Sequence, residues 1–206
     1  MLKKIVNILL KLKFFYPLVN FSSEIAYKIL SLKKYVDFKK SNAFEKANFF
    51  IKNQKVNSGP FKGLNYDGIS AYCSTIYPKL LGSYEHELHE TILNIIKKKY
   101  DRIIDIGSAE GYYAVGIPFA TKDIKQEIIA VEISDIAKQN LKKLIENNIK
   151  NKVEIVDNFS FEKYEDDKKT LVIMDCEGAE LEYLSKIKKK YLLKWDFLIE
   201  VHVQLK

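Results

Sequence analysis

The sequence predicts an α/β fold in which helices cover a doubly wound, mostly parallel sheet of about five strands. Five short apolar runs follow one another after residue 100, helical patterns separate several of them, and polar or glycine-containing loops follow them. Short runs that are apolar throughout, rather than alternating, are typical of parallel strands buried on both faces. We expect this domain to span residues 59–206, after an N-terminal helical extension over residues 1–58.

Residues 1–58 predict a basic helical extension. Apolar residues recur at helical spacing from Ile5 to Val19, and Pro17 is expected to break this helix before a second one begins near Ser23. Twelve lysines and three acidic residues fall within the first 60 positions, so the net charge of +7 arises here. A basic amphipathic helix can lie on an anionic membrane surface, and packing on the domain or on a partner is the alternative.

The composition favours a reduced, cytoplasmic protein. Cys73 and Cys176 are far apart in the sequence and make no disulfide or metal-binding pattern. The apolar stretch 5–10 is too short for a helix that spans a membrane. Arg102 is the only arginine, and arginine is the side chain best suited to bidentate contacts with phosphate and guanine, so sequence-specific nucleic-acid binding is disfavoured. We therefore expect a cytoplasmic protein that can touch the inner face of a membrane through its extension.

Between residues 59 and 99 the sequence predicts an irregular segment followed by one helix. Three glycines keep the chain irregular as far as Gly82, with a short hairpin around residues 64–66. Ser83 is the expected N-cap of the helix, acidic residues fill its first turn, and residues 97–99 close the last turn, which suits the helix dipole. The buried stripe of this helix is expected to be Leu88, Ile92, Ile95 and Ile96.

Strands and helices alternate from residue 102 onward. The expected strands are 102–106, 127–132, 153–156, 170–175 and 195–201, and the expected helices follow Gly111 and cover residues 134–148 and 179–189. Pro118 should shorten or kink the first of these helices. The fifth strand would form an open edge, so either the sequence is a fragment, or a second copy of the chain, a partner or the extension covers that edge.

The segment 103–113 (IIDIGSAEGYY) carries the strongest functional pattern. A strand ends beside Asp105, and a tight loop with Gly107 and Gly111 leads into a helix. Ligands bind at this edge of parallel sheets, glycines let the backbone come close to a ligand, and a helix N-terminus favours an anionic group. A dinucleotide fingerprint would need further glycines at 109 and 112, and a phosphate-binding loop would need a lysine after Gly111. The acidic-x-Gly-x-x-x-Gly pattern instead indicates a site for S-adenosylmethionine (SAM), whose carboxylate would meet the loop.

Glu132 ends the second strand, where an acidic side chain can accept hydrogen bonds from both ribose hydroxyls of a bound nucleoside. A surface glutamate at a strand end is the alternative. The expected SAM-binding residues are Asp105, Gly107, Ser108, Ala109, Glu110, Gly111, Tyr112, Glu132 and, beside the adenine, Asp157 and Asn158.

Three segments resemble FkbM-type class I SAM-dependent methyltransferases. They are 105–113 (DIGSAEGYY), 173–180 (IMDCEGAE) and 198–202 (LIEVH), and the segment 77–85 is also similar to relatives of this group. The resemblance covers about residues 59–202. It implies a Rossmann-like class I methyltransferase fold and O-methylation of a hydroxyl on a sugar, glycan or small natural product. The sheet of that family continues past the fifth strand with an antiparallel pair, which we expect to be missing here.

Polar residues after the fourth and fifth strands are the candidates for catalysis. Asp175 is the first candidate for a general base or an anchor of the acceptor, with helix capping as the alternative. Glu177 and His202 are the other catalytic candidates, although a structural role is an equal alternative for the histidine. The residues expected to contact the substrate are Tyr84, Glu85 and Glu180.

Two other functions remain open. A nucleic-acid methyltransferase would use the lysine-rich extension to grip the phosphates of RNA. A truncated, non-catalytic relative would keep the fold and a vestigial SAM pocket. No metal is expected, because His86 and His89 lack the His-Glu-x-x-His spacing and a third ligand, so a solvated helix face is favoured there.

Overall fold

The computed structural model describes residues 33, 54–123 and 125–202. The chain divides into two compact units, residues 1–52 and residues 53–206, and the larger unit carries the features discussed below. The predicted helices of the extension lie outside the described residues, except that Lys33 is helical and exposed. Among the described residues, no helix is long and apolar enough to cross a membrane.

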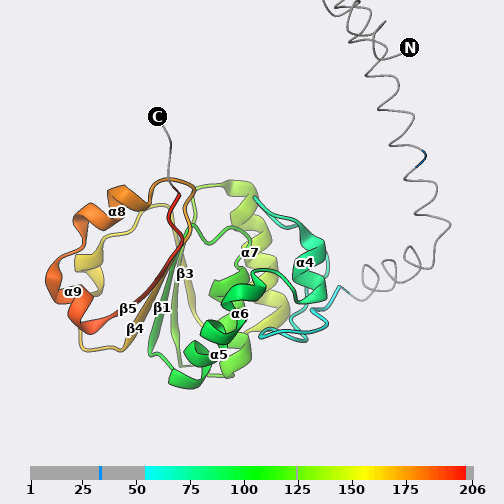
Figure 1. Cartoon of the computed structure of the whole chain (residues 1–206), viewed down its shortest axis with the longest axis horizontal. Helices are drawn as coiled ribbons and strands as arrows, with labels where there is room; N and C mark the ends of the chain where they lie inside the picture. Colours follow the sequence, from blue (N-terminus) through cyan, green and yellow to red (C-terminus); the bar gives the residue numbers. More distant parts are fainter. Residues whose placement is uncertain (1–32, 34–53, 124, 203–206) are drawn as a thin grey trace, which may run out of the picture. The chain divides into compact units, whose positions relative to one another are not determined.

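The larger unit is a Rossmann-like α/β fold with an all-parallel sheet of five strands in the order β3-β2-β1-β4-β5 (Figure 1). The strands are β1 (Arg102–Ile106), β2 (Glu127–Val131), β3 (Val153–Val156), β4 (Thr170–Met174) and β5 (Asp196–Ile199). Each of them falls within one of the five predicted apolar runs. β1 lies at the centre, where Asp105 is opposite Ala130 of β2 and Ile173 of β4.

Helices cover both faces of the sheet. The helices are α4 (Ile76–Leu81), α5 (His89–Lys98), α6 (Tyr112–Thr121), α7 (Asp135–Asn148), α8 (Glu180–Lys186) and α9 (Lys189–Lys194), with the 3-10 turns η2 (His86–Leu88) and η3 (Phe161–Tyr164). Figure 1 shows α5, α6 and α7 on one side of the sheet and α8 and α9 on the other. The predicted doubly wound arrangement is therefore confirmed.

The core consists of two apolar layers because neighbouring strand residues point to opposite faces. On β1, Ile103 packs in the layer that contains Leu141 of α7. Its neighbour Ile104 packs in the other layer, with Phe161 of η3 and Trp195 after α9. Strands that bury both faces need apolar residues at every position, which is why the sequence shows continuous apolar runs.

Replacing Leu141 by alanine should lower the free energy of unfolding by about 2–5 kcal/mol, because Leu141 is fully buried and leaves a cavity. Leu193 of α9 is 77% exposed, so Leu193→Ala is the matched control and should change that free energy by less than about 0.5 kcal/mol. Urea unfolding of the full chain, followed by circular dichroism, measures both. Equal effects of the two variants would contradict this packing.

The segment before β1 differs from the prediction. The helix expected to begin at Ser83 begins at His89, because Glu85 has a φ of +46° that lies outside the helical range. The structure also contains α4, which the sequence does not predict because three glycines in this segment indicate irregular chain. Gly82 ends α4 with a φ of +77°, and a Cβ there would lie 2.0 Å from the carbonyl oxygen of Ser58. This glycine is therefore required by close packing.

Three further observations concern the start of the larger unit, the proline within α6 and the edge strand β5. Residues 54–58, which the sequence assigned to the extension, pack with the larger unit, and the N–H of Val56 donates to the carbonyl of Leu64 at 2.9 Å. Pro118 lies within α6, and that helix ends at Thr121. Within the described part of the chain, β5 pairs with β4 alone, so it forms the expected open edge.

Candidate functional site

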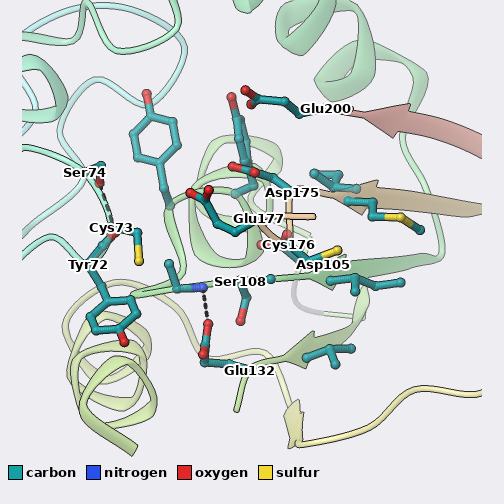
Figure 2. A pocket seen from close by; sticks show the side chains of 18 of the residues that line it. Tyr72, Cys73, Ser74, Asp105, Ser108, Glu132, Asp175, Cys176, Glu177 and Glu200 are labelled. Carbon is teal, nitrogen blue, oxygen red and sulfur yellow. Dashed lines mark hydrogen bonds between the residues drawn. The ribbon is translucent and has the colours of Figure 1, made fainter. Parts of the chain in front are cut away.

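A cavity of about 980 Å³ lies at the carboxyl edge of the sheet. The last residues of β1, β2, β4 and β5 line it, together with the loops that follow these strands. Residues 72–75, Lys79 and residues from the turn around η2 form further parts of the wall. The parallel strands bring these loops together, as expected at the carboxyl edge of such a sheet. Figure 2 shows labelled side chains from several of these segments around one space.

The loop after β1 lies against the end of β4. Gly107 has a φ of +83°, and a Cβ there would lie 1.9 Å from the carbonyl oxygen of Asp175. Gly111 has a φ of +95°, and its Cβ would meet Leu141 of α7 at 2.4 Å. Close backbone packing thus requires Gly107, which also lines the cavity, whereas at Gly111 the contact is with a side chain and the positive φ is what favours glycine. Gly107, Ser108, Ala109 and Tyr112, which the sequence predicts to bind SAM, line the cavity, whereas Gly111 lies behind the loop.

Glu132 is buried beside this loop and lines the same cavity. Its Oε2 accepts a hydrogen bond from the N–H of Ala109 at 2.8 Å, and its Oε1 accepts one from the N–H of Ser134 at 2.7 Å. Figure 2 shows the side chain directed toward the loop. Each carboxylate oxygen can accept a second hydrogen bond. Glu132 therefore shapes the loop and retains capacity for hydroxyl donors.

Asp105 is buried at the end of β1 and also lines the cavity. Its Oδ2 accepts a hydrogen bond from the N–H of Ala114 in the first turn of α6, at 2.9 Å. Burial raises the pKa of this carboxyl group from 3.8 to about 7, although the Ala114 hydrogen bond acts in the opposite direction. A nearby cation would restore the charged form.

Two buried oxygen atoms in the cavity wall have no hydrogen-bond partner within the described part of the chain, Ser108 Oγ and Asp175 Oδ1. Such atoms are rare in folded proteins because each one loses its hydrogen bonds to water. Ser108 is 4% exposed, so bulk solvent satisfies it poorly. Both atoms are therefore suited to polar groups of a ligand.

A cluster of Asp175, Glu177, Glu200 and His202 forms the side of the cavity beyond β4 and β5. His202 Nε2 lies 3.6 Å from Glu200 Oε1, 3.7 Å from Glu177 Oε2 and 3.9 Å from Asp175 Oδ1. Burial, followed by the charge of Glu200, raises the pKa of Asp175 to about 6. Ligand atoms of Asp175, Glu200 and His202 lie within 4.8 Å of one another, close enough to share a cation.

Besides Gly111, three predicted site residues do not line the cavity. Glu110 is fully buried behind it, where its carboxylate pairs with Lys79 and accepts a hydrogen bond from the N–H of Tyr72 at 2.9 Å. Asn158 lies outside the wall, whereas Asp157 is part of it and accepts from Lys138 at 2.8 Å. The third residue, Glu180, is buried and supports His202 instead of facing a substrate.

The predicted substrate residues Tyr84 and Glu85 do line the cavity. The hydroxyl group of Tyr113 donates a hydrogen bond to the carboxylate of Glu85. His89, considered above for metal binding, has its Nε2 3.1 Å from the carbonyl oxygen of Tyr84. That contact gives His89 a role in holding the cavity wall.

Sequence reasoning missed Glu200 and residues 72–75 as parts of the site. Glu200 follows β5 two positions before His202, so the strand-end rule that identified Glu132 could have found it. No sequence signal marks residues 72–75, because the segment is held by a long-range hydrogen bond, from the N–H of Tyr72 to Glu110.

A scan against models of protein families, a search of curated proteins and a search of solved structures each find no match to this chain. The chemistry of the cavity is therefore inferred from its own residues.

Proposed function

We propose that this chain is a SAM-dependent methyltransferase that O-methylates a hydroxyl group of a sugar, a glycan or a small natural product. The observation that carries the proposal is the shared cavity of the Gly107 loop and Glu132 on one side and the Asp175 cluster on the other. The first side suits a nucleoside with an amino-acid tail. The second side suits a hydroxyl group that must lose a proton. A class I methyltransferase fold is the finer fold assignment that belongs to this proposal.

The residues of the first side fit SAM. Ser108 offers an unpartnered hydroxyl group, and Glu132 keeps lone pairs for the ribose hydroxyls. Asp105 is a carboxyl group that a ligand ammonium would stabilise in its charged form. Asp157, the residue predicted to meet the adenine, lines the same cavity. When bound, SAM supplies a methyl group on a positively charged sulfur.

The residues of the second side orient the acceptor and hold its proton. An in-line displacement depends mainly on the position of the acceptor oxygen, and a general base assists when the acceptor is a hydroxyl group. Asp175 and His202 are the groups of the described cluster at which a proton can be held near neutral pH.

The charge of the cavity argues against the nucleic-acid alternative. Eight acidic residues line it, against two basic ones, and one of these, Lys79, is paired with Glu110. The acidic residues are Glu85, Glu87, Asp105, Glu132, Asp157, Asp175, Glu177 and Glu200. Phosphate groups would be repelled by such a wall, whereas a cationic cofactor and a neutral acceptor would not.

SAM at ~100 times its dissociation constant should raise the free energy of unfolding by about 2.7 kcal/mol. Thermal unfolding with and without SAM or S-adenosylhomocysteine tests this on the full chain. Glu132→Gln removes a negative charge and one acceptor oxygen, so calorimetry should show at least about a tenfold weaker affinity, equivalent to about 1.4 kcal/mol. Glu146→Gln on the exposed face of α7 is the matched control and should bind as the wild type does.

The absence of stabilisation by both compounds would overturn the proposal. Stabilisation without methyl transfer to any of a panel of neutral sugars and phenols would instead favour the non-catalytic alternative. Transfer of labelled methyl to RNA, lost on deletion of residues 1–52, would favour the nucleic-acid alternative.

A further inference from the structure

We propose that Glu180 is a positioning residue that fixes the tautomer and orientation of His202, so that His202 Nε2 faces the acceptor side of the cavity as the general base. This inference rests on the proposed function for the identity of the reaction. It rests on the structure alone for the tautomer and the orientation of the imidazole.

Glu180 forms hydrogen bonds both to the turn after β4 and to His202 after β5. Its side chain is 1% exposed, and its Oε1 lies 3.1 Å from His202 Nδ1. The same oxygen accepts hydrogen bonds from the N–H groups of Cys176 at 3.0 Å and Gly178 at 3.1 Å. These contacts hold a strained turn, in which Glu177 has a φ of +53°. Glu180 therefore sets the position of both His202 and the turn that carries Glu177.

The charge state of Glu180 determines the tautomer of His202. Burial acts to raise the pKa of Glu180, but hydrogen bonds from the backbone at Gly178 and Glu180 and from His202 outweigh it and lower the pKa to about 2. An ionised carboxylate only accepts hydrogen bonds, so Nδ1 of His202 must carry a proton. In the neutral imidazole the lone pair is then on Nε2.

His202 Nε2 is directed at the acidic side of the cavity. The oxygens of Glu200, Glu177 and Asp175 lie 3.6–3.9 Å away, which is beyond hydrogen-bond distance but close for charges. Figure 2 shows that these three side chains reach the same region from the ends of β4 and β5. A proton that arrives at Nε2 is therefore stabilised by three carboxylates.

This arrangement lets His202 take the hydroxyl proton of the acceptor during methyl transfer. The acceptor O–H bond breaks and its proton moves to Nε2, which leaves an imidazolium ion held by Glu180. The acceptor oxygen forms a bond to the transferred carbon as the carbon–sulfur bond breaks, and the electron pair of that bond stays on sulfur. Asp175 stabilises the resulting imidazolium ion. The pKa of His202 is raised above 6.5, first by the hydrogen bond from Nδ1 to Glu180 and then by the charges of the nearby carboxylates. A base with such a pKa is effective near neutral pH.

Nitrogen-15 spectra of the three histidines in the full chain test the inference without SAM or acceptor. At high pH, His202 should be in the Nδ1–H tautomer, and its titration midpoint should lie above 6.5. Glu180→Gln keeps an acceptor oxygen but removes the charge, so the midpoint should fall, because the hydrogen bond to Glu180 is the main cause that raises the pKa of His202. Glu182→Gln is the matched control, because Glu182 is exposed on the same helix and pairs with Lys186. It should leave the midpoint unchanged.

Two outcomes would overturn the inference. They are an Nε2–H tautomer of His202 in the wild type and an unchanged midpoint in folded Glu180→Gln. If Glu180→Gln does not fold, the wild-type tautomer still decides the question. Failure of SAM binding leaves these spectra unaffected, so it contradicts the proposed function separately.

Discussion

Replacing Lys79 by methionine should lower the free energy of unfolding by about 3–5 kcal/mol. Lys79 is 2% exposed and Glu110 is fully buried, and the two form an ion pair. Methionine keeps the apolar stem of Lys79 but leaves the charge of Glu110 buried without its counter-ion. Such an uncompensated charge costs much more than the loss of an exposed ion pair. Urea unfolding of the full chain measures the difference.

Two variants separate this effect from a general effect of losing a lysine. Lys98 pairs with Asp196 at 2.5 Å, and both side chains are about half exposed, so Lys98→Met should cost less than about 1 kcal/mol. The double variant Lys79→Met/Glu110→Gln removes both charges and should recover more than half of the stability lost in Lys79→Met. A double variant no more stable than the single one would show that the pair does not carry the effect.

The Lys79–Glu110 pair also connects two walls of the cavity. Glu110 belongs to the loop after β1, and its Oε2 accepts from the N–H of Tyr72 at 2.9 Å. The ammonium group of Lys79 lies 4.6 Å from the ring centre of Tyr84 and 5.2 Å from that of Tyr112. These contacts are favourable cation–π interactions. Loss of the pair should therefore loosen the part of the cavity wall formed by residues 72–75, Lys79 and Tyr84.

The strands were predictable because burial on both faces produces a continuous apolar run in the sequence. β1 and β4 are buried at every position, so polar residues are excluded except where a partner exists, as for Asp105. The segment before β1 is harder to predict, because Gly82 indicates irregular chain in the sequence but ends α4 in the structure. Ser83 has the chemistry of an N-cap, but the positive φ of Glu85 delays the helix. That angle depends on tertiary contacts, which a local pattern does not encode.

The site was predictable where a residue ends a strand and less so within loops. Asp105 and Glu132 follow from the rule that parallel strands deliver their ends to one edge. Glu110 belongs to the same motif, yet the loop turns its side chain into the interior. Glu180 is expected to contact the substrate because it follows the fourth strand at the same edge, whereas it pairs with His202, 22 residues away. Which of several carboxylates pairs with a histidine depends on side-chain directions that only the folded chain defines.

Stability of the wild type should fall as the pH rises from 5 to 8, partly because of Asp105. The folded-state pKa of Asp105 is raised from 3.8 to about 7, so the folded chain holds this proton more tightly than the unfolded chain. The resulting stabilisation is fully present below the unfolded pKa and is lost as the pH rises through 7. Between pH 5 and 8 the loss attributable to Asp105 should be about 3 kcal/mol.

Asp105→Asn isolates this contribution because the amide does not titrate and its oxygen can still accept from the N–H of Ala114. Asp175, whose pKa is raised to about 6, acts in the same direction in both proteins, so its effect largely cancels in the comparison. Urea unfolding at pH 5, 6, 7 and 8 measures the free energy of unfolding of both proteins. From pH 5 to pH 8, this free energy should rise by about 3 kcal/mol in Asp105→Asn relative to the wild type. Parallel pH profiles of the two proteins would show that Asp105 is ionised throughout this range.

The same proton links Asp105 to the proposed ligand. An ammonium group placed against Asp105 favours its charged form, so binding of SAM at pH 6 should release a proton from the wild type. Calorimetry in two buffers with different ionisation enthalpies measures that release, and Asp105→Asn should abolish it. Proton release together with the pH-dependent stability would place the ligand amine at the end of β1. Binding without release would place the amine elsewhere in the cavity, because a buried carboxyl group with a pKa near 7 would otherwise lose its proton.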